Sequence, residues 1–151
     1  MEPQLKPSQR ASSVGRIGPI SQGVGSATSA WIDATLFHNY LAVIMTGVLG
    51  AAATVDAKFQ QATSSGGAGA KDVTGKAITQ LVKASNDNND ALINIKQEDL
   101  DTANGFKFIQ LSVTVGAAAS LIAAEVLGFD PRNLEASNSL NAAATQVQVV
   151  A

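Results

Sequence analysis

The sequence predicts an all-β fold, an antiparallel β-sandwich or jelly-roll-like domain. Two observations carry this prediction: from Trp31 onward, short apolar segments are separated by clusters of Gly, Ser, Asn and Asp, and no helical period is sustained. The chain has 151 residues, enough for one domain with a real core. We therefore expect a sandwich domain over residues 29–132, an extended arm over residues 1–28 and a tail over residues 133–151.

Two strands are expected in the first half of the domain. Residues 40–49 are apolar on both faces, as in a strand that is covered on both sides. Residues 54–62 alternate instead, with Val55, Ala57 and Phe59 on one face and polar side chains on the other.

The second half holds the remaining strands. Residues 91–97 and 106–115 are predicted to be strands. For residues 120–129 we prefer a strand over a helix because Leu121, Ala123, Leu127 and Phe129 share one parity, which only Glu125 interrupts. Pro131 then ends that strand, since proline cannot donate to a ladder. Residues 76–84 fit a strand or a helix equally well. Turns are expected at residues 64–69, 85–90 and 98–105.

The two ends of the chain have a different character. Residues 1–28 hold three of the four prolines and four glycines, and their apolar residues are isolated, so they indicate an extended arm that lies on another surface. The tail ends in "TQVQVVA", whose alternation predicts a terminal strand that pairs with its own sheet or with a neighbour's open edge. The subunit-contact candidates at the two ends are Val14, Ile17, Ile20, Val24, Val147 and Val149.

Charge is scarce in this chain. Charged residues make up 15% of the sequence, against about a quarter in ordinary soluble domains. A surface so poor in charge suits a subunit covered by neighbours, although a small monomeric domain is the alternative reading. The net charge of -2 gives no general attraction to nucleic acid, and we expect none to bind.

Cysteine is absent, which rules out disulfides and thiolate metal sites. The first residues lack the apolar core of a secretion signal. The longest apolar runs, residues 40–55 and 111–124, are shorter than the roughly 20 residues of a bilayer span. We therefore expect buried strands and no membrane partner.

The stretch "GAGAKDVTGKA" (67–77) is rich in glycine and lysine, as a phosphate-binding loop is, but its glycines do not have the spacing of such a loop. A P-loop needs two glycines separated by four residues, then Lys, then Ser or Thr. Ala70 stands in place of the first glycine and Ala77 in place of the Mg²⁺-binding hydroxyl. We expect a flexible hairpin connection and no nucleotide cofactor.

Other candidate chemistry is weak, and we expect no enzyme. His38 is the single histidine and has no identifiable catalytic partner. The carboxylates of residues 98–101 and the run "NDNND" (86–90) lack the ligand order of an EF-hand, so no metal site is predicted, and a structural cation is the alternative to solvated turns. Trp31 could stack on a sugar, but a core anchor is the simpler reading.

A family resemblance adds to this reading. The succession "SAWIDATLF", "LAVIMTGVL", "ATVDAKFQQATSSGGAGAKDV", "ALINIKQEDLD", "GFKFIQLSVTV" and "AAEVLGFDPR" resembles small structural proteins of tailed bacteriophages and prophages, over residues 29–132. The resemblance implies a β-sandwich subunit of a virion, without enzymatic activity, that is made in the cytoplasm of a bacterial host.

Within that class, three roles are open. A capsid decoration (cement) protein would sit on the capsid exterior, bind the major capsid protein through its arm and form a homo-oligomer, for which we expect a trimer. A head–tail connector or tail subunit would contact other virion subunits instead. A carbohydrate- or receptor-binding module is the third alternative.

Overall fold

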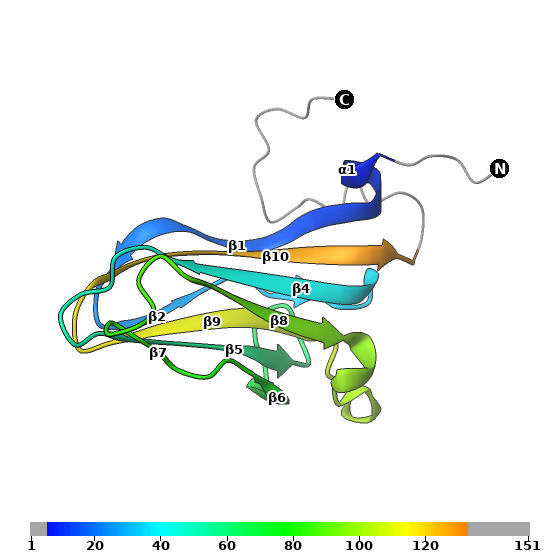
Figure 1. Cartoon of the computed structure of the whole chain (residues 1–151). Helices are drawn as coiled ribbons and strands as arrows, with labels where there is room; N and C mark the ends of the chain where they lie inside the picture. The colour runs from blue at the N-terminus through cyan, green and yellow to red at the C-terminus, as the bar shows by residue number, and fades with distance from the viewer. Residues whose placement is uncertain (1–5, 133–151) are drawn as a thin grey trace.

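The computed structural model describes residues 6–132, which form two antiparallel sheets packed face to face (Figure 1). The first sheet has the strand order β1–β10–β4–β8, and the second has the order β2–β9–β5–β6, with β3 beside β9 and β7 beside β5. The strands of the first sheet are β1 (Ala11–Gln22), β10 (Ser120–Pro131), β4 (Phe37–Thr46) and β8 (Asp90–Lys96). Those of the second are β2 (Gly25–Thr28), β3 (Ile32–Asp33), β5 (Thr54–Ala62), β6 (Lys71–Ala77), β7 (Leu81–Val82) and β9 (Phe108–Gly116).

The strand order is that of a jelly roll. Strands β2 and β3 pair with the two ends of β9, and β6 and β7 pair with the two ends of β5, so each pair acts as one interrupted strand. Counted this way, the sheets hold strands 1-8-3-6 and 2-7-4-5, and the chain changes sheet at every connection except that between β5 and β6. Two such sheets wrapped from interleaved strands form the jelly-roll architecture.

Within residues 6–132, helical structure is confined to three short turns. The helix α1 (Pro7–Arg10) precedes β1, and the 3-10 helices η1 (Gln97–Asp99) and η2 (Thr102–Asn104) lie between β8 and β9. Within residues 6–132, no helix has the length and apolarity to cross a membrane.

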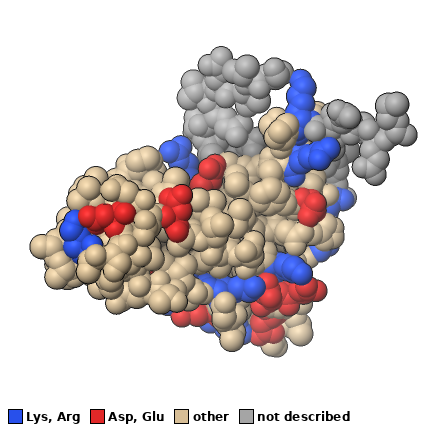
Figure 2. Space-filling view, in the orientation of Figure 1, with Lys and Arg blue, Asp and Glu red and all other residues tan. Residues whose placement is uncertain are grey.

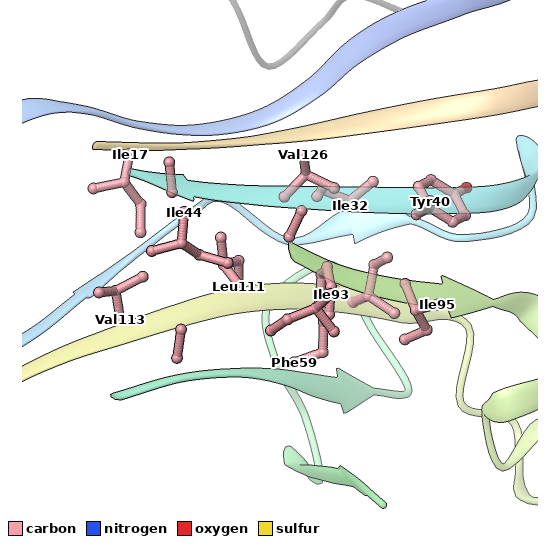
Figure 3. Close-up of a cluster of buried hydrophobic side chains, with 14 of the residues drawn as sticks. Ile17, Ile32, Tyr40, Ile44, Phe59, Ile93, Ile95, Leu111, Val113 and Val126 are labelled. Atoms are coloured by element: carbon pink, nitrogen blue, oxygen red, sulfur yellow. The ribbon is translucent and has the colours of Figure 1, made fainter. Parts of the chain in front are cut away.

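The core lies between the two sheets, where the inward side chains of each strand meet (Figure 3). Ile44 from the first sheet and Phe59 and Leu111 from the second are fully buried there. Tyr40 is the polar member of this layer: its hydroxyl donates to the Asp33 carbonyl oxygen at 3.1 Å and accepts from the Phe37 N–H at 3.2 Å. Burial raises the pKa of that hydroxyl above its ordinary value, so it stays a donor.

Several sequence-based expectations are confirmed. The strand expected over residues 54–62 is β5, and Val55, Ala57 and Phe59 face the core as their alternation predicted. The strand reading of residues 120–129 is also correct, because β10 spans Ser120–Pro131 and ends at the proline. The polar turn and the helical loop expected at residues 85–90 and 98–105 lie at those places.

The structure differs from the sequence-based prediction of an extended N-terminal arm. Residues 11–28 are not an arm outside the domain, because β1 pairs with β10 along its length and β2 pairs with β9. Val14 and Ile17, expected as subunit contacts, are 5% and 7% exposed and belong to the core. The boundary expected at residue 28 is therefore wrong, and the sandwich begins with β1.

The reason lies in two β-bulges. Register shifts between Ser13 and Gly15 and between Ile17 and Ile20 change which parity faces the core, so the strand shows no regular alternation. Gly15 is also a packing requirement and not a sign of flexibility, since a Cβ there would lie 2.6 Å from the Ile32 Cδ1 atom.

A second difference concerns the stretch 67–77, expected to be a flexible connection. Its first part is a turn, but residues 71–77 form strand β6 beside β5. Gly75 has a φ of 73°, and the β5–β6 register shifts between Lys58 and Gln60 opposite this part of the strand. Because of this irregularity, the side chains of β6 do not follow the period-2 alternation that indicates a strand in a sequence. Of the ambiguous residues 76–84, only Leu81–Val82 form a further strand, β7.

We expect Ile17→Ala to lower the free energy of unfolding by about 2–4 kcal/mol, because it leaves a cavity in the core. Its control is Ile20→Ala, the same change three residues later on a side chain that is 50% exposed, for which less than about 1 kcal/mol is expected. Urea denaturation of the two variants measures the difference. If both variants were as stable as the parent protein, Ile17 would not be a core residue and β1 would be a detached arm.

Candidate interaction surface

Exposed apolar side chains gather at one end of the sandwich. This end holds the β1–β2, β4–β5, β7–β8 and β9–β10 connections. Of the eight large apolar side chains that are exposed within residues 6–132, seven lie in this half, and Leu36 in the β3–β4 connection does not. We call this region the apolar end, and its seven side chains are Ile20, Val24, Met45, Val48, Val82, Leu92 and Leu121.

Small residues let two turns of the apolar end lie against each other. Gly50 in the β4–β5 turn has no room for a side chain, since a Cβ there would lie 2.4 Å from the Ala119 carbonyl oxygen. The turns are tied by backbone bonds: the Gly47 N–H donates to the Leu121 carbonyl at 2.8 Å, and the Leu121 N–H donates to the Val48 carbonyl at 3.2 Å. Two alanines adopt positive φ there, Ala52 at 56° and Ala117 at 67°.

The run 86–90, considered above as a possible cation loop, braces the same turns. The Leu49 N–H donates to the Asp87 carboxylate at 2.9 Å, and the Thr46 hydroxyl donates to the Asn89 carbonyl at 2.9 Å. The Lys83 ammonium, 2.5 Å from Asp87, and the Leu49 N–H hold the pKa of that carboxyl below its usual range. Asp87 is thus committed to the backbone and to a lysine. Among residues 6–132, no group of His, Asp or Glu is placed to hold a metal ion.

A hollow of about 400 Å³ opens on the apolar end where β1, β4 and β10 meet. Its lining is mainly apolar and includes Pro19, Ile20, Met45, Gly47, Leu121 and Ala123. Aliphatic side chains with few polar groups form a seat for another apolar surface rather than for a polar small molecule.

The outer faces of the two sheets also differ in polarity. Outward positions of the first sheet carry many apolar side chains: Leu41, Val43, Met45, Leu92, Ala123, Leu127 and Phe129. Polar side chains stand among them, including Arg16 and Glu125, opposite each other in the β1–β10 register, and Asn39, Asp90, Asn94 and Lys96 toward the β8 side. Outward positions of the second sheet are polar and bonded to one another, as in the Ser26–Thr114 and Lys58–Asp72 contacts. The outer face of the first sheet is therefore the more apolar of the two.

The opposite end carries most of the ion pairs. Lys71 lies 2.6 Å from Asp101, Lys76 lies 3.0 Å from Asp99, and Lys96 contacts Glu98. In Figure 2, charged atoms crowd the lower right, where Figure 1 shows the helical turns after β8, and most of the other visible surface is tan. The "EDLD" carboxylates thus pair with separate lysines instead of converging on one ion.

These ion pairs lower the pKa values of the acids that take part in them. The Lys71 ammonium, with help from Asn104, holds the pKa of Asp101 below its ordinary value. The Lys58 ammonium does the same for the pKa of Asp72. At Asp99, partial burial raises the pKa, but the Lys96 N–H and the Lys76 ammonium outweigh it, so the net shift is downward.

The remaining sequence candidates are dispersed. His38 is exposed at the start of β4 and lines a polar hollow of about 310 Å³ with Lys96, Glu98 and Arg132. Trp31 packs on the turn before β6, because a Cβ on Gly67 would lie 2.7 Å from the indole Nε1. The two residues belong to separate parts of the sandwich, and neither lies in the apolar end.

The subunit-contact candidates have three outcomes. Val14 and Ile17 are core residues, as described above. Ile20 and Val24, 50% and 67% exposed, are available on the apolar end. Val147 and Val149 lie outside the described residues. The sequence reading missed Val48, Met45 and Leu121, although the small-residue turns "GAAA" that follow two apolar strands were a signal for them.

Comparison with known proteins gives structural neighbours alone. No protein-family model matches the chain, and no curated protein sequence does. A chain of infectious bursal disease virus, strain Gx, is similar at 14% identity and a TM-score of 0.44; the match covers 84% of this protein and 33% of that chain. A chain of the empty virus-like particle of cowpea mosaic virus is similar at 12% identity and a TM-score of 0.40, over 87% of this protein and 86% of that chain. The jelly-roll assignment rests on the strand order described above.

We expect acid to destabilise the fold. Carboxyls whose pKa is lowered by folding stabilise it fully above the unfolded pKa of about 3.9, and this stabilisation is lost as the pH falls through the folded pKa. The free energy of unfolding in urea should therefore fall below about pH 4. Lys58→Gln combined with Lys71→Gln should make that fall shallower, since it removes the partners of Asp72 and Asp101. An unchanged acid slope in the double variant would contradict the assignment of these pairs.

Proposed function

We propose that this protein is a non-enzymatic structural subunit of a virion and that it binds neighbouring subunits through its apolar end. The single observation that carries the proposal is the concentration of exposed apolar side chains at one end of a jelly roll whose opposite end carries ion pairs. An apolar patch of this kind marks a protein–protein contact. The fold alone assigns no function, so the proposal stands on this surface.

The more specific role that we propose is a capsid decoration protein of a tailed bacteriophage. The sequence resemblance over residues 29–132 supports the phage class, and the jelly-roll fold is one that viral capsids use. Decoration subunits cover the repeated surface of a shell, and a compact domain with one apolar end suits that task. The partner is then the major capsid protein, and the protein acts on the capsid exterior as a homo-oligomer, for which a trimer fits a symmetry axis.

The contact elements differ from those expected from the sequence. Residues 11–28 are strands of the sandwich, so they do not act as a mobile arm. Ile20 contributes from the end of β1 and Val24 from the β1–β2 connection. Val48 in the β4–β5 turn and Leu121 at the start of β10 stand beside each other. Because the turns are braced by Asp87 and by backbone bonds, little ordering is required on binding.

We expect the double variant Val24→Asp with Val48→Asp to bind purified capsids much more weakly. Burying two carboxylates in an apolar contact costs several kcal/mol in the bound state, so the dissociation constant should rise by about 100-fold or more. Co-sedimentation with shells that lack the protein measures this. The matched control is Leu36→Asp, an apolar-to-acid change at the opposite end, which should bind as the parent does. Equal loss in the control, or no loss in the double variant, would contradict the assigned surface.

Copy number separates the two virion roles. A decoration protein should be present at on the order of hundreds of copies per particle, distributed over the shell, because it follows the symmetry of the capsid. A head–tail connector or tail subunit would form a ring at one vertex or along the tail. Quantitative mass spectrometry of purified particles and imaging of the labelled protein measure this, and a single ring would replace the decoration role with the connector role.

A further inference from the structure

The edges of the two sheets are not equally protected. An edge strand presents unpaired backbone N–H and C=O groups, and natural proteins protect such edges with bulges, proline, charge or short strands. Within residues 6–132, the first sheet ends at β1 and β8, and the second sheet ends at the β2–β3 side and at the β6–β7 side.

Three of these four edges carry a protective device. Strand β1 has two bulges and Pro19, which cannot donate to an added strand. The β2–β3 side is broken into strands of four and two residues. Strand β6 has Gly75 at positive φ and places Lys71 and Lys76 in ion pairs along it.

The fourth edge, β8, is regular. It pairs with β4 through seven consecutive positions without a register shift, from Asn39↔Lys96 to Met45↔Asp90. The strand "DALINIK" has no proline and no glycine, and its two charged residues stand at its ends. Leu92 in its middle is 59% exposed. An open, regular edge with an exposed leucine is a site for strand addition.

The described chain ends at the same end of the first sheet as the C-terminus of β8, and its last side chain reaches toward that strand. The Arg132 guanidinium donates to the side-chain oxygen of Gln97, the residue that follows β8. Arg132 also lines one hollow with Lys96 and Gln97. The chain therefore leaves the sandwich at the end of β10, on the same side of the sheet as the C-terminal end of β8 and with β4 between the two strands. A segment that crossed the end of β4 and turned back from there would run antiparallel to β8.

The sequence beyond Arg132 contains a segment suited to this edge. Residues 145–150, "TQVQVV", alternate polar and β-branched side chains and carry no charge. The twelve residues 133–144 precede it, and an extended chain of that length reaches about 40 Å, more than is needed to cross from the end of β10, past β4, to the outer side of β8.

From these observations we propose that residues 145–150 add to β8 of the same chain as an antiparallel strand and close the open edge of the first sheet. The occupant is the chain's own segment because a tethered strand binds at a high effective concentration, above that of a second molecule in dilute solution. The added strand satisfies the outer backbone groups of β8 and places side chains beside Leu92. This proposal does not depend on the virion role, since it concerns the closure of the sandwich itself.

Hydrogen exchange of the β8 amides in the full-length protein tests the proposal. In the parent protein, all amides of residues 91–95 should be protected from exchange, both those that face β4 and those on the outer edge of β8. Val147→Pro combined with Val149→Pro removes two backbone donors from the added strand, and exchange of the outward β8 amides should then accelerate by about tenfold or more. The amides of β4 should be unchanged, which reports that the sandwich is intact.

The control is Ala142→Pro combined with Ala144→Pro, the same change in the preceding linker, which should leave β8 protected. Protection that persists on dilution supports pairing within one chain. Three results would overturn the proposal: unchanged β8 exchange in the Val147/Val149 variant, equal loss of protection in the control, or protection of the parent protein that vanishes on dilution. The last result would assign the strand to a second copy of the chain.

Discussion

Pairing of β1 with β10 is the contact on which the rest of the sandwich depends. It joins the first and the last strand of the described chain, so the sheet forms only when residues about 100 or more positions apart meet. Once β1 is in place, Val14 and Ile17 cover the core beside Val126, and β10 becomes an interior strand between β1 and β4. Without β1, β10 would be an edge and part of the core would face water, at a cost proportional to the apolar area exposed.

The same strands that build the core also build the apolar surface. In β4, residues of one parity, such as Ala42 and Ile44, face the second sheet, while Leu41, Val43 and Met45 face outward. Strand β5 has the usual alternation, with Asp56 and Lys58 outward. The first sheet therefore carries apolar side chains on both faces, and those of its outer face stay partly exposed.

Rigidity at the apolar end comes from small residues and from one carboxylate. Gly50 and the alanines of the β9–β10 turn allow two backbones to approach closely, and Asp87 satisfies a turn N–H while it pairs with Lys83. At the opposite end, Asp101 and Asp99 pair with Lys71 and Lys76 of β6. The two ends of the sandwich therefore differ: one is rigid and apolar, and the other is charged and faces solvent. This difference suits a subunit that attaches by one side.

The sequence by itself determined the all-β class, the bounds of β5 and the end of β10 at Pro131, because regular alternation and proline act locally. It could not determine that β1 belongs to the sandwich, since two bulges erase its alternation and Gly15 looks like a linker residue until Ile32 is packed against it. Nor could it assemble the apolar end, whose members come from turns far apart in sequence. Only the interleaved strand order brings those turns together, because pairing across the sheets is a long-range choice.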